Sequence, residues 1–538
     1  MVEESNHENC ADFGMNNSTS LARVIVRQII EAGITDVVVS PGSRNAPLSL
    51  AFYAAAERGL IKLHVRIDER TAAFFALGII KATGRPVPVV CTSGTAVANY
   101  HPAVLEASHT NAPLLVLTAD RPAILRKTGA NQTTEQARIY GKAVRYFADV
   151  DGPVFPMELP FDSLRSGPVH LNIQFDEPML PDDSEQWLDE IKVAPKLFVS
   201  RTKAGTLKSD ANRGVLVIGH DRGGLSAQDV NDFANALGWP VIAEDPLSFP
   251  QAIAHASIFL TSSEIRAALI PQTVIVIGRT TLSRSINAYV KLAPTQIAID
   301  PRIATVDSDR HADKRFTEIP ILNAHAASDE WLAQWKKFAL RCAKNIDQLA
   351  GFTEATIAKE LAAALPNGAS LFVSSSRPIR DLEGFATPRS GISTYANRGL
   401  AGIDGNISTA LGIASASTQT FAVLGDLSFL HDLTGFIQRE EINCCFIVIN
   451  NDGGGIFSTL PQRGVSGFET IFGTPHGLDP AAIAASMGIK SSTISSIDSL
   501  KKLIAQPVKG ISVVVANVPS RDANADSLKA IYESMKSI

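Results

Sequence analysis

The sequence is poor in the features that mark several large classes of protein. Its 538 residues include only five cysteines, an odd number without C-x-x-C spacing, so neither a disulfide framework nor a zinc site is indicated. No segment approaches the ~18 apolar residues that a membrane span requires. The net charge is a mild −5, and no basic tail or long charge run suggests nucleic acid or an anionic membrane as a partner. These absences favour a reducing, cytoplasmic compartment.

What is present is typical of a globular α/β chain. The hydrophobic share is 45%, the charged share is 19%, and 538 residues suggest three or four domains. Short β-branched runs such as Val37–Ser40, Val87–Cys91 and Leu114–Leu117 alternate with longer amphipathic runs. This succession predicts parallel sheets with helices on both faces. Ligands of such sheets bind beyond the carboxyl ends of the strands, where the Gly- and Ser-rich loops fall.

Three series of this kind divide the chain. The stretch 176–212 is polar and lacks a strand pattern, and 325–352 is interpreted as a helical connection. The predicted fold class is α/β, with three doubly wound parallel-sheet domains. We expect the following division: a disordered N-terminus (1–17), a first domain (18–185), a linker (186–212), a central domain (213–340) and a third domain (341–538).

The strongest local signal lies in the third domain, after two predicted strands. Gly-Asp426-Leu-Ser follows Phe-Ala-Val-Leu, and Asn451 stands 25 residues later, directly after Phe-Ile-Val-Ile-Asn. This pair resembles the G-D-x…N-N motif of thiamine-diphosphate enzymes. Two neighbouring strands would each deliver an oxygen ligand to one Mg²⁺ or Mn²⁺, and a glycine carbonyl can turn toward the same ion. The predicted ligands are Asp426, Asn451 and Gly453 for the ion, and the backbone N–H groups of Leu427 and Ser428 for the diphosphate.

The other half of such a site is a glutamate on another domain, which hydrogen-bonds the cofactor's aminopyrimidine and so assists deprotonation of the thiazolium. Glu69 stands at a strand-to-helix junction and is followed by an apolar run, which suits a carboxyl group whose protonation must be tunable. Glu69 is therefore the predicted catalytic residue. Ile403 is the candidate for the bulky residue that holds the cofactor bent. Residues 18–185 become the pyrimidine-binding domain, and residues 341–538 the diphosphate- and metal-binding domain.

Together these pieces resemble one family, the menaquinone-pathway synthases of 2-succinyl-5-enolpyruvyl-6-hydroxy-3-cyclohexene-1-carboxylate. The resemblance runs from about residue 18 to the end. The thiamine motif alone indicates only a thiamine enzyme, whereas its combination with Pro-Gly-Ser-Arg and Ala-Asn-Gln is specific to this family. The segments that carry the resemblance are Ser40–Leu48, Asp68–Arg70, Thr92–Ala96, Thr118–Pro122, Gly129–Gln132, Ser376–Asp381, Asn397–Gly399, Gly402–Gly405 and Phe472–Gly477.

The resemblance implies a transferase with two dicarboxylate substrates. 2-Oxoglutarate adds to thiamine diphosphate and loses CO₂, and the four-carbon carbanion then adds to isochorismate in a 1,4-addition. Arginine pairs with carboxylates bidentately, which explains the arginines of the loops. The positions that match substrate-binding residues are Ser43, Arg44, Arg121, Asn131, Gln132, Arg284, Ser376, Arg380 and Arg398. Those that match a dry apolar wall beside the thiazolium are Ile456, Phe457 and Leu460.

Two other interpretations are open at this point. An acetohydroxyacid synthase or another thiamine carboligase would leave several buried guanidinium groups unpaired by a monoanionic 2-oxo acid. A non-catalytic thiamine-fold protein would be expected to lack Glu69 or a metal ligand, and all of them are present. The resemblance also implies a homodimer or homotetramer with the cofactor between subunits. The sequence does not choose a late proton donor among His101, His109, His431 and His476.

Overall fold

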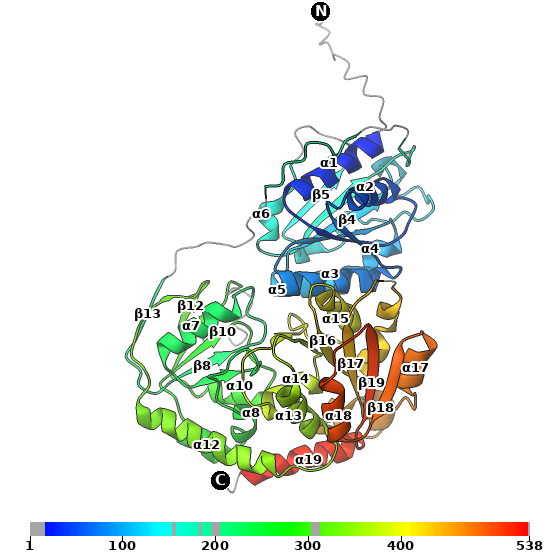
Figure 1. The fold of residues 1–538 in the computed structure, drawn as a ribbon. Helices are drawn as coiled ribbons and strands as arrows, with labels where there is room; N and C mark the ends of the chain where they lie inside the picture. The colour runs from blue at the N-terminus through cyan, green and yellow to red at the C-terminus, as the bar shows by residue number, and fades with distance from the viewer. Residues whose placement is uncertain are drawn as a thin grey trace, which may run out of the picture.

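The computed structural model of the chain describes residues 17–152, 158–181, 186–194, 205–302, 312–438 and 440–535. Within these residues, three large parallel sheets follow one another along the chain, each flanked by helices (Figure 1). This architecture confirms the predicted α/β class. The segment 1–17, which we expected to be disordered, lies outside the described residues except for Asn17, the first residue of the first helix.

The first sheet has the strand order β2-β1-β3-β4-β6-β5, and all of its paired strands are parallel. Its central strands are buried along their whole length, as expected for a sheet covered on both faces. Its elements are α1 (Asn17–Glu31), β1 (Asp36–Val39), α2 (Ala46–Glu57), β2 (Lys62–Val65), α3 (Glu69–Thr83), β3 (Val87–Cys91), α4 (Thr95–Asn99), α5 (His101–Thr110), β4 (Leu114–Asp120), β5 (Tyr146–Val150), α6 (Phe161–Leu164) and β6 (Val169–Gln174).

The middle sheet has the order β12-β11-β10-β8-β9, and a separate parallel pair joins β13 to β7. Strand β7 corrects the prediction that 176–212 contains no strand, because it pairs with a segment more than one hundred residues later that no local pattern could reveal. Helix α12 confirms the helical connection expected at 325–352. The elements are β7 (Thr206–Ser209), β8 (Gly214–Ile218), α7 (Ala227–Leu237), β9 (Val241–Ala243), α8 (Ala256–Phe259), α9 (Ser263–Ala268), β10 (Thr273–Ile277), α10 (Arg284–Val290), β11 (Thr295–Ile299), β12 (Lys314–Phe316), β13 (Ile321–Ala324) and α12 (Asp329–Asp347).

The third sheet has the order β15-β14-β16-β17-β19-β18, which repeats the pattern of the first sheet strand for strand. In both sheets the strand order reverses beside the first strand, and such a switch point is where ligands of doubly wound sheets bind. The elements are α13 (Glu354–Ala364), β14 (Ser370–Val373), α14 (Arg377–Phe385), β15 (Ser393–Tyr395), α15 (Asn406–Ala414), β16 (Thr420–Gly425), α16 (Asp426–His431), β17 (Cys444–Asn450), α17 (Pro480–Ser486), β18 (Lys490–Ile494), α18 (Ile497–Ile504), β19 (Ile511–Asn517) and α19 (Arg521–Ser534).

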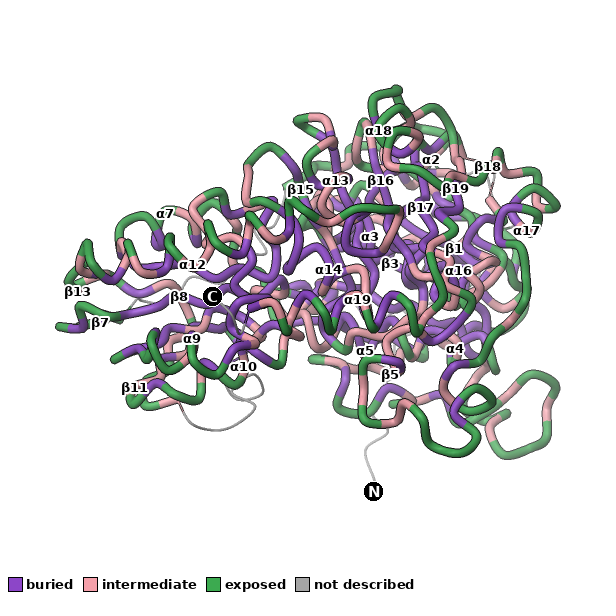
Figure 2. The backbone as a smooth tube through the Cα atoms, turned by 90° about the horizontal axis from the view of Figure 1, so that it is seen from below, coloured by how far each residue is buried: buried purple, intermediate pink, exposed green. Residues whose placement is uncertain are grey.

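The first and third domains share one hydrophobic core because α3 and α15 pack against each other (Figure 1). Figure 2 shows that α3 lies among buried residues. The two helices approach most closely at Gly78 and Gly412. A Cβ atom built on Gly412 would stand 2.1 Å from the carbonyl oxygen of Phe75, and one on Gly78 would stand 2.2 Å from that of Thr409. Only glycine fits at this crossing of the two helices. The contact fixes the position of the first domain relative to the third, and with it the position of Glu69 at the start of α3.

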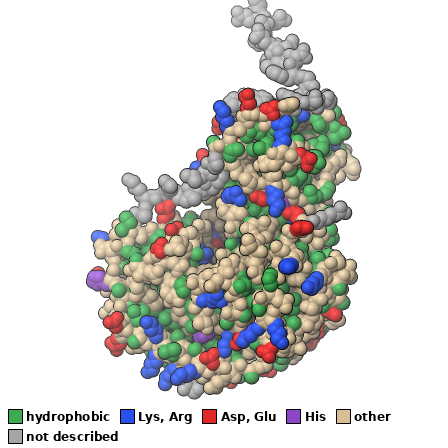
Figure 3. All heavy atoms as spheres, in the orientation of Figure 1, with side chains coloured by type: hydrophobic (Ala, Val, Ile, Leu, Met, Phe, Trp, Pro, Cys, Tyr) green, Lys and Arg blue, Asp and Glu red, His purple; other side chains and the backbone are tan. Residues whose placement is uncertain are grey.

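Acidic and basic side chains are interspersed on the face shown in Figure 3, as the mild net charge leads one to expect. None of the helices in the described ranges is both long enough and apolar enough to cross a membrane.

Candidate active site

Two neighbouring strands of the third sheet bring Asp426 and Asn451 together. Asp426 opens α16 directly after β16, and Asn451 follows β17, the strand paired with β16. The backbone N–H of Gly453 donates to Asp426 Oδ2 at 2.8 Å, which ties the two loops to each other. Burial raises the pKa of Asp426, although N–H groups and His476 hydrogen-bond its carboxylate. A buried carboxylate in this position could bind a cation.

Asn451 presents an oxygen that the protein itself leaves unused. Its Oδ1 atom is buried and has no hydrogen-bond partner within the described residues, although buried polar atoms nearly always have one. The described part of the chain has no cluster of three or more His, Cys, Asp or Glu side chains able to hold a metal, so a cation here would need amide and carbonyl oxygens. A carboxylate beside a free amide oxygen fits a hard divalent cation such as Mg²⁺.

Two of the glycines around the predicted ligands have no room for a side chain, and a third borders open space. Gly453 has φ +128°, and a Cβ atom on it would lie 2.2 Å from the carbonyl oxygen of Gly473. A Cβ atom on Gly455 would lie 2.3 Å from Asn451 Nδ2, so this glycine makes room for the ligand side chain. Gly425 instead faces open space, with no protein atom within 4 Å of its missing Cβ. The Gly-Asp and Asn-Asn-Asp-Gly-Gly-Gly segments thus leave room beside the ligands.

Asn406 joins the predicted cofactor residues Ile403 and Ser428, and sequence reasoning missed it. Its Nδ2 donates to the Ile403 carbonyl at 3.0 Å and to Ser428 Oγ at 2.6 Å, and the side chain is buried. The N–H of Leu427 donates to the side chain of Asp426 at 2.7 Å. Asn406 directly follows the Gly-Ile-Asp-Gly segment, and that proximity was the available signal.

The predicted apolar wall lies on the loop that follows the metal ligands. Ile456 and Phe457 belong to a 3-10 turn at Gly455–Thr459, and the N–H of Leu460 donates to the Phe457 carbonyl at 3.1 Å. The ring of Phe457 packs on Phe472 with centroids 5.5 Å apart, so the wall is held by the Phe472–Gly477 segment. The same segment carries His476, whose Nε2 lies 3.3 Å from Asp426 Oδ2.

Glu69, the predicted catalytic residue, lies on the first domain. It is the first residue of α3, is partly buried, and accepts a hydrogen bond from Asn99 Nδ2 at 3.2 Å. Its neighbour Asp68 accepts from Thr434 Oγ1 of the third domain at 2.8 Å. Among the described residues, no hydrogen bond or ion pair connects Glu69 with Asp426, Asn451 or Gly453. Asn99 had no signal in the sequence.

A polar cluster forms at the carboxyl ends of the first sheet. Arg121 Nη1 donates to Ser93 Oγ at 2.7 Å and to the Gln132 carbonyl at 2.9 Å, while Gln132 Nε2 donates back to the Ser93 carbonyl. Arg44 lies close enough for Arg121 to lower its pKa, after burial, which is the larger cause. Two guanidinium groups that repel each other favour an anion between them. Ser43 and Asn131 are exposed on the adjoining loops.

A second cationic cluster lies where the middle and third domains meet. Arg398 is 2% exposed and forms an ion pair with the equally buried Glu244 at 2.9 Å. Arg380 donates to the carbonyl of Ser376 at 2.5 Å, and burial followed by the charges of Arg377 and Arg398 lowers its pKa. Burial raises the pKa of Glu383, a further carboxyl group of this cluster, well above its usual range.

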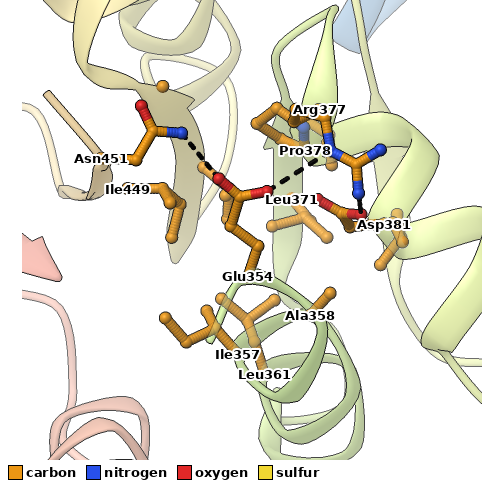
Figure 4. Close-up of a pocket in the computed structure, with 14 residues that line it drawn as sticks. Glu354, Ile357, Ala358, Leu361, Leu371, Arg377, Pro378, Asp381, Ile449 and Asn451 are labelled. Atoms are coloured by element: carbon orange, nitrogen blue, oxygen red, sulfur yellow. Dashed lines mark hydrogen bonds and ion pairs between the residues drawn. The ribbon is translucent and has the colours of Figure 1, made fainter. Parts of the chain in front are cut away.

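Two further predicted substrate-binding residues, Arg284 and Ser376, lie in this region. Arg284 begins α10 and is exposed; the nearby Leu282 N–H donates to Glu244 Oε1 at 3.0 Å. Ser376 has φ +75°, a strained conformation for a residue other than glycine, which is typical of binding sites. Sequence reasoning missed Glu354, which joins Arg377 and Asp381 of the Ser376–Asp381 segment in lining a cavity beside Asn451 (Figure 4).

Comparison with known proteins agrees with this geometry. Three family models match in succession: "Thiamine pyrophosphate enzyme, N-terminal TPP binding domain" at residues 19–139, "Middle domain of thiamine pyrophosphate" at 182–373, and "Thiamine pyrophosphate enzyme, C-terminal TPP binding domain" at 381–518. A 2-succinyl-5-enolpyruvyl-6-hydroxy-3-cyclohexene-1-carboxylate synthase of Thermobifida fusca (strain YX) is 38% identical, with 97% of this chain and 99% of the relative covered. The chain belongs to this synthase family.

Other members of the synthase family support the same assignment. The synthase of Nocardioides sp. (strain ATCC BAA-499 / JS614) is 39% identical over 95% of this chain and 96% of its own. That of Lysinibacillus sphaericus (strain C3-41) is 37% identical over 87% and 89%. The predicted family and its thiamine-dependent, transferase character are therefore confirmed, and the acetohydroxyacid synthase alternative is set aside.

Proposed function

We propose that the protein decarboxylates 2-oxoglutarate and transfers the remaining four-carbon unit to isochorismate by 1,4-addition. The observation that carries this proposal is the pair of cationic clusters, one around Arg44 and Arg121 and the other around Arg380 and Arg398. Burial, and then a neighbouring arginine, lowers the pKa of Arg44 in the first cluster and of Arg380 in the second. Both proposed substrates are dicarboxylates. Guanidinium groups at such sites bind carboxylates through two parallel hydrogen bonds.

The residues of this chain have separate tasks in that reaction. Thiamine diphosphate, when bound, supplies the carbon nucleophile that takes up the 2-oxo acid. Glu69 holds or releases a proton at its carboxyl group, oriented by the N–H of Asn99. The arginine clusters hold the substrate carboxylates, with Ser43, Asn131, Gln132, Arg284 and Ser376 as the further proposed contacts. Ile456, Phe457 and Leu460 exclude water from the reacting carbon.

We further propose that Asp426, Asn451 and Gly453 bind Mg²⁺ or Mn²⁺, and that Leu427 and Ser428 adjoin the diphosphate. Support comes from the unpartnered Oδ1 atom of Asn451 and from the open space beside Gly425. Ile403, tied to Ser428 through Asn406, is the proposed support for the bent cofactor. The division into a pyrimidine-binding domain (18–185), a linker (186–212), a central domain (213–340) and a diphosphate-binding domain (341–538) belongs to the same proposal.

A homodimer, or a dimer of dimers, is the proposed active assembly. Glu69 shares no hydrogen bond or ion pair with the metal ligands of its own chain, within the described residues. Val65 and Ile67, beside Glu69, are 50% and 66% exposed, which is unusual for large apolar side chains next to a catalytic residue. The proposed compartment is the cytoplasm, which agrees with the unpaired state of the four described cysteines, Cys91, Cys342, Cys444 and Cys445.

The test combines the purified protein with thiamine diphosphate, Mg²⁺, 2-oxoglutarate and isochorismate, and follows isochorismate absorbance together with CO₂ release. We expect both signals to require all four additions, and 2-oxoglutarate to be strongly preferred over pyruvate. Glu69→Gln should abolish turnover with little loss of cofactor binding, whereas Glu57→Gln, an exposed glutamate at the end of α2, should leave both unchanged. Equal turnover of pyruvate and 2-oxoglutarate, or an active Glu69→Gln variant, would contradict the proposal.

A further inference from the structure

A buried glutamate that belongs to none of the site motifs contacts the proposed metal ligand Asn451. Asn451 Nδ2 donates to Glu354 Oε1 at 2.6 Å, and Figure 4 shows the two side chains pointing toward each other, one from the loop after β17 and the other from the start of α13. Glu354 is 8% exposed and stands 97 residues before Asn451 in the chain. This contact comes from tertiary structure alone.

The chemistry of the contact fixes which way the amide faces. A carboxylate accepts hydrogen bonds and donates none, so only the NH₂ group of Asn451 can face Glu354. The amide oxygen must then point to the opposite side. That oxygen is the buried Oδ1 atom without a partner among the described residues. If the amide were turned over, two acceptors would face each other, and an NH₂ group would face the cation.

Glu354 is itself held firmly in place. It opens α13 behind the N-cap residue Thr353, and its backbone N–H donates to Asn524 Oδ1 at 3.3 Å. Its second carboxyl oxygen accepts from Arg377 Nε at 3.3 Å, and Arg377 also pairs with Asp381 (Figure 4). A charged partner and a fixed backbone leave the Glu354 carboxylate one orientation.

We propose that Glu354 is a positioning residue that orients the Asn451 amide so that its oxygen, and not its nitrogen, faces the divalent cation. The inference rests on the metal site proposed above. Groups that orient a metal ligand from outside the coordination shell commonly contribute 10- to 100-fold, roughly, to metal affinity. Glu354 acts on the cation only through Asn451, so its effect must depend on the presence of an amide at position 451.

The test measures Mn²⁺ binding in the presence of thiamine diphosphate by electron paramagnetic resonance titration, without substrates. We expect Glu354→Gln to weaken Mn²⁺ binding about 10- to 100-fold. Arg377 can only donate, so it selects the amide oxygen of the glutamine and leaves the NH₂ group facing Asn451, which turns the Asn451 amide over. Glu360→Gln is the matched control: it lies on the same helix, paired with Lys501 at 2.7 Å, and should bind Mn²⁺ like the wild type. Wild-type affinity in Glu354→Gln would overturn the inference.

The same titration in an Asn451→Asp background separates orientation from a general structural effect. A carboxylate has two equivalent oxygens and needs no orienting group, so Glu354→Gln should cost nothing when residue 451 is aspartate. An equal loss in both backgrounds would overturn the inference. If Glu354→Gln lacks the circular-dichroism spectrum of the wild type, Glu354→Ala carries the same expectation in both backgrounds. A wild-type protein that binds no Mn²⁺ would refute the proposed metal site, and this inference with it.

Discussion

Removing the guanidinium of Arg398 should destabilise the protein even before any substrate is present. Arg398 and Glu244 are both buried, and the guanidinium contacts both carboxyl oxygens at 2.9–3.3 Å. Glu244 also accepts the N–H groups of His220 and Leu282, each at 3.0 Å, so it cannot turn away to find water. In Arg398→Met this carboxylate stays buried without its cation.

The expected cost is about 3–5 kcal/mol, the range found when one partner of a buried ion pair is removed. The middle and third domains together form a unit of roughly 330 residues; at about 2.1 cal/mol/K per residue, that cost lowers the midpoint of thermal unfolding by roughly 4–7 °C. Scanning calorimetry of the cofactor-free protein measures it directly. Because the pair joins the end of β9 to the loop before α15, the transition of the third domain should move together with that of the middle domain.

A double variant distinguishes the structural role of Arg398 from its proposed role in binding a substrate carboxylate. Glu244→Gln added to Arg398→Met removes the buried charge, and the amide oxygen can still accept one backbone N–H. We expect most of the lost stability to return while catalytic activity stays low. An unfolding midpoint of Arg398→Met within 1 °C or so of the wild type would refute the buried-charge argument. Full activity in the double variant would refute the proposed role in binding a substrate carboxylate.

Two further predictions concern the contacts between the first and third domains. Gly412→Ala places a methyl group 2.1 Å from the Phe75 carbonyl oxygen, so the free energy of unfolding in urea should fall by about 1–3 kcal/mol; an unchanged midpoint would contradict the close crossing of α3 and α15. Glu440 is partly buried, which raises its pKa, but His64 and Arg66 outweigh burial and lower the pKa to about 2. Its stabilising effect should therefore be present above about pH 4.5 and lost as the pH falls toward 2. The difference in melting temperature between wild type and Glu440→Gln should be full at pH 6, shrink below about pH 4.5 and close as the pH approaches 2.

The sequence predicted the large features because each depends on local chemistry. The strands that precede Asp426 and Asn451 are apolar, β-branched runs, and a parallel sheet is the arrangement that buries them on both faces. The loops after them contain glycines that the structure cannot replace, at Gly453 and Gly455. Ligand types and their strand-end positions therefore follow from the pattern of residues.

What the sequence could not predict depends on long-range packing. Strand β7 is defined by its partner β13, and the role of Arg398 is defined by Glu244, 154 residues away. Glu354 and Asn99 carry no local signal, because a glutamate at the start of a helix and an asparagine at the end of one are common everywhere. Only the fold reveals that they orient Asn451 and Glu69.

The charges around the two arginine clusters give a physical reason why the two proposed substrates are dicarboxylates. In the first cluster, Asp120 is paired with Arg126 at 2.9 Å. The carboxylates of Asp176 and Glu177 near Arg44 are exposed, and that of Glu177 approaches it only at 3.6 Å. In the second cluster, Glu244 neutralises one arginine, while Arg380 donates to the neutral carbonyl oxygen of Ser376. Burial lowers the pKa of Arg44 and of Arg380, so each cluster holds a partly desolvated guanidinium whose cost a bound anion would reduce. The proposed dicarboxylate substrates supply more of the matching negative charge than a monoanionic 2-oxo acid would.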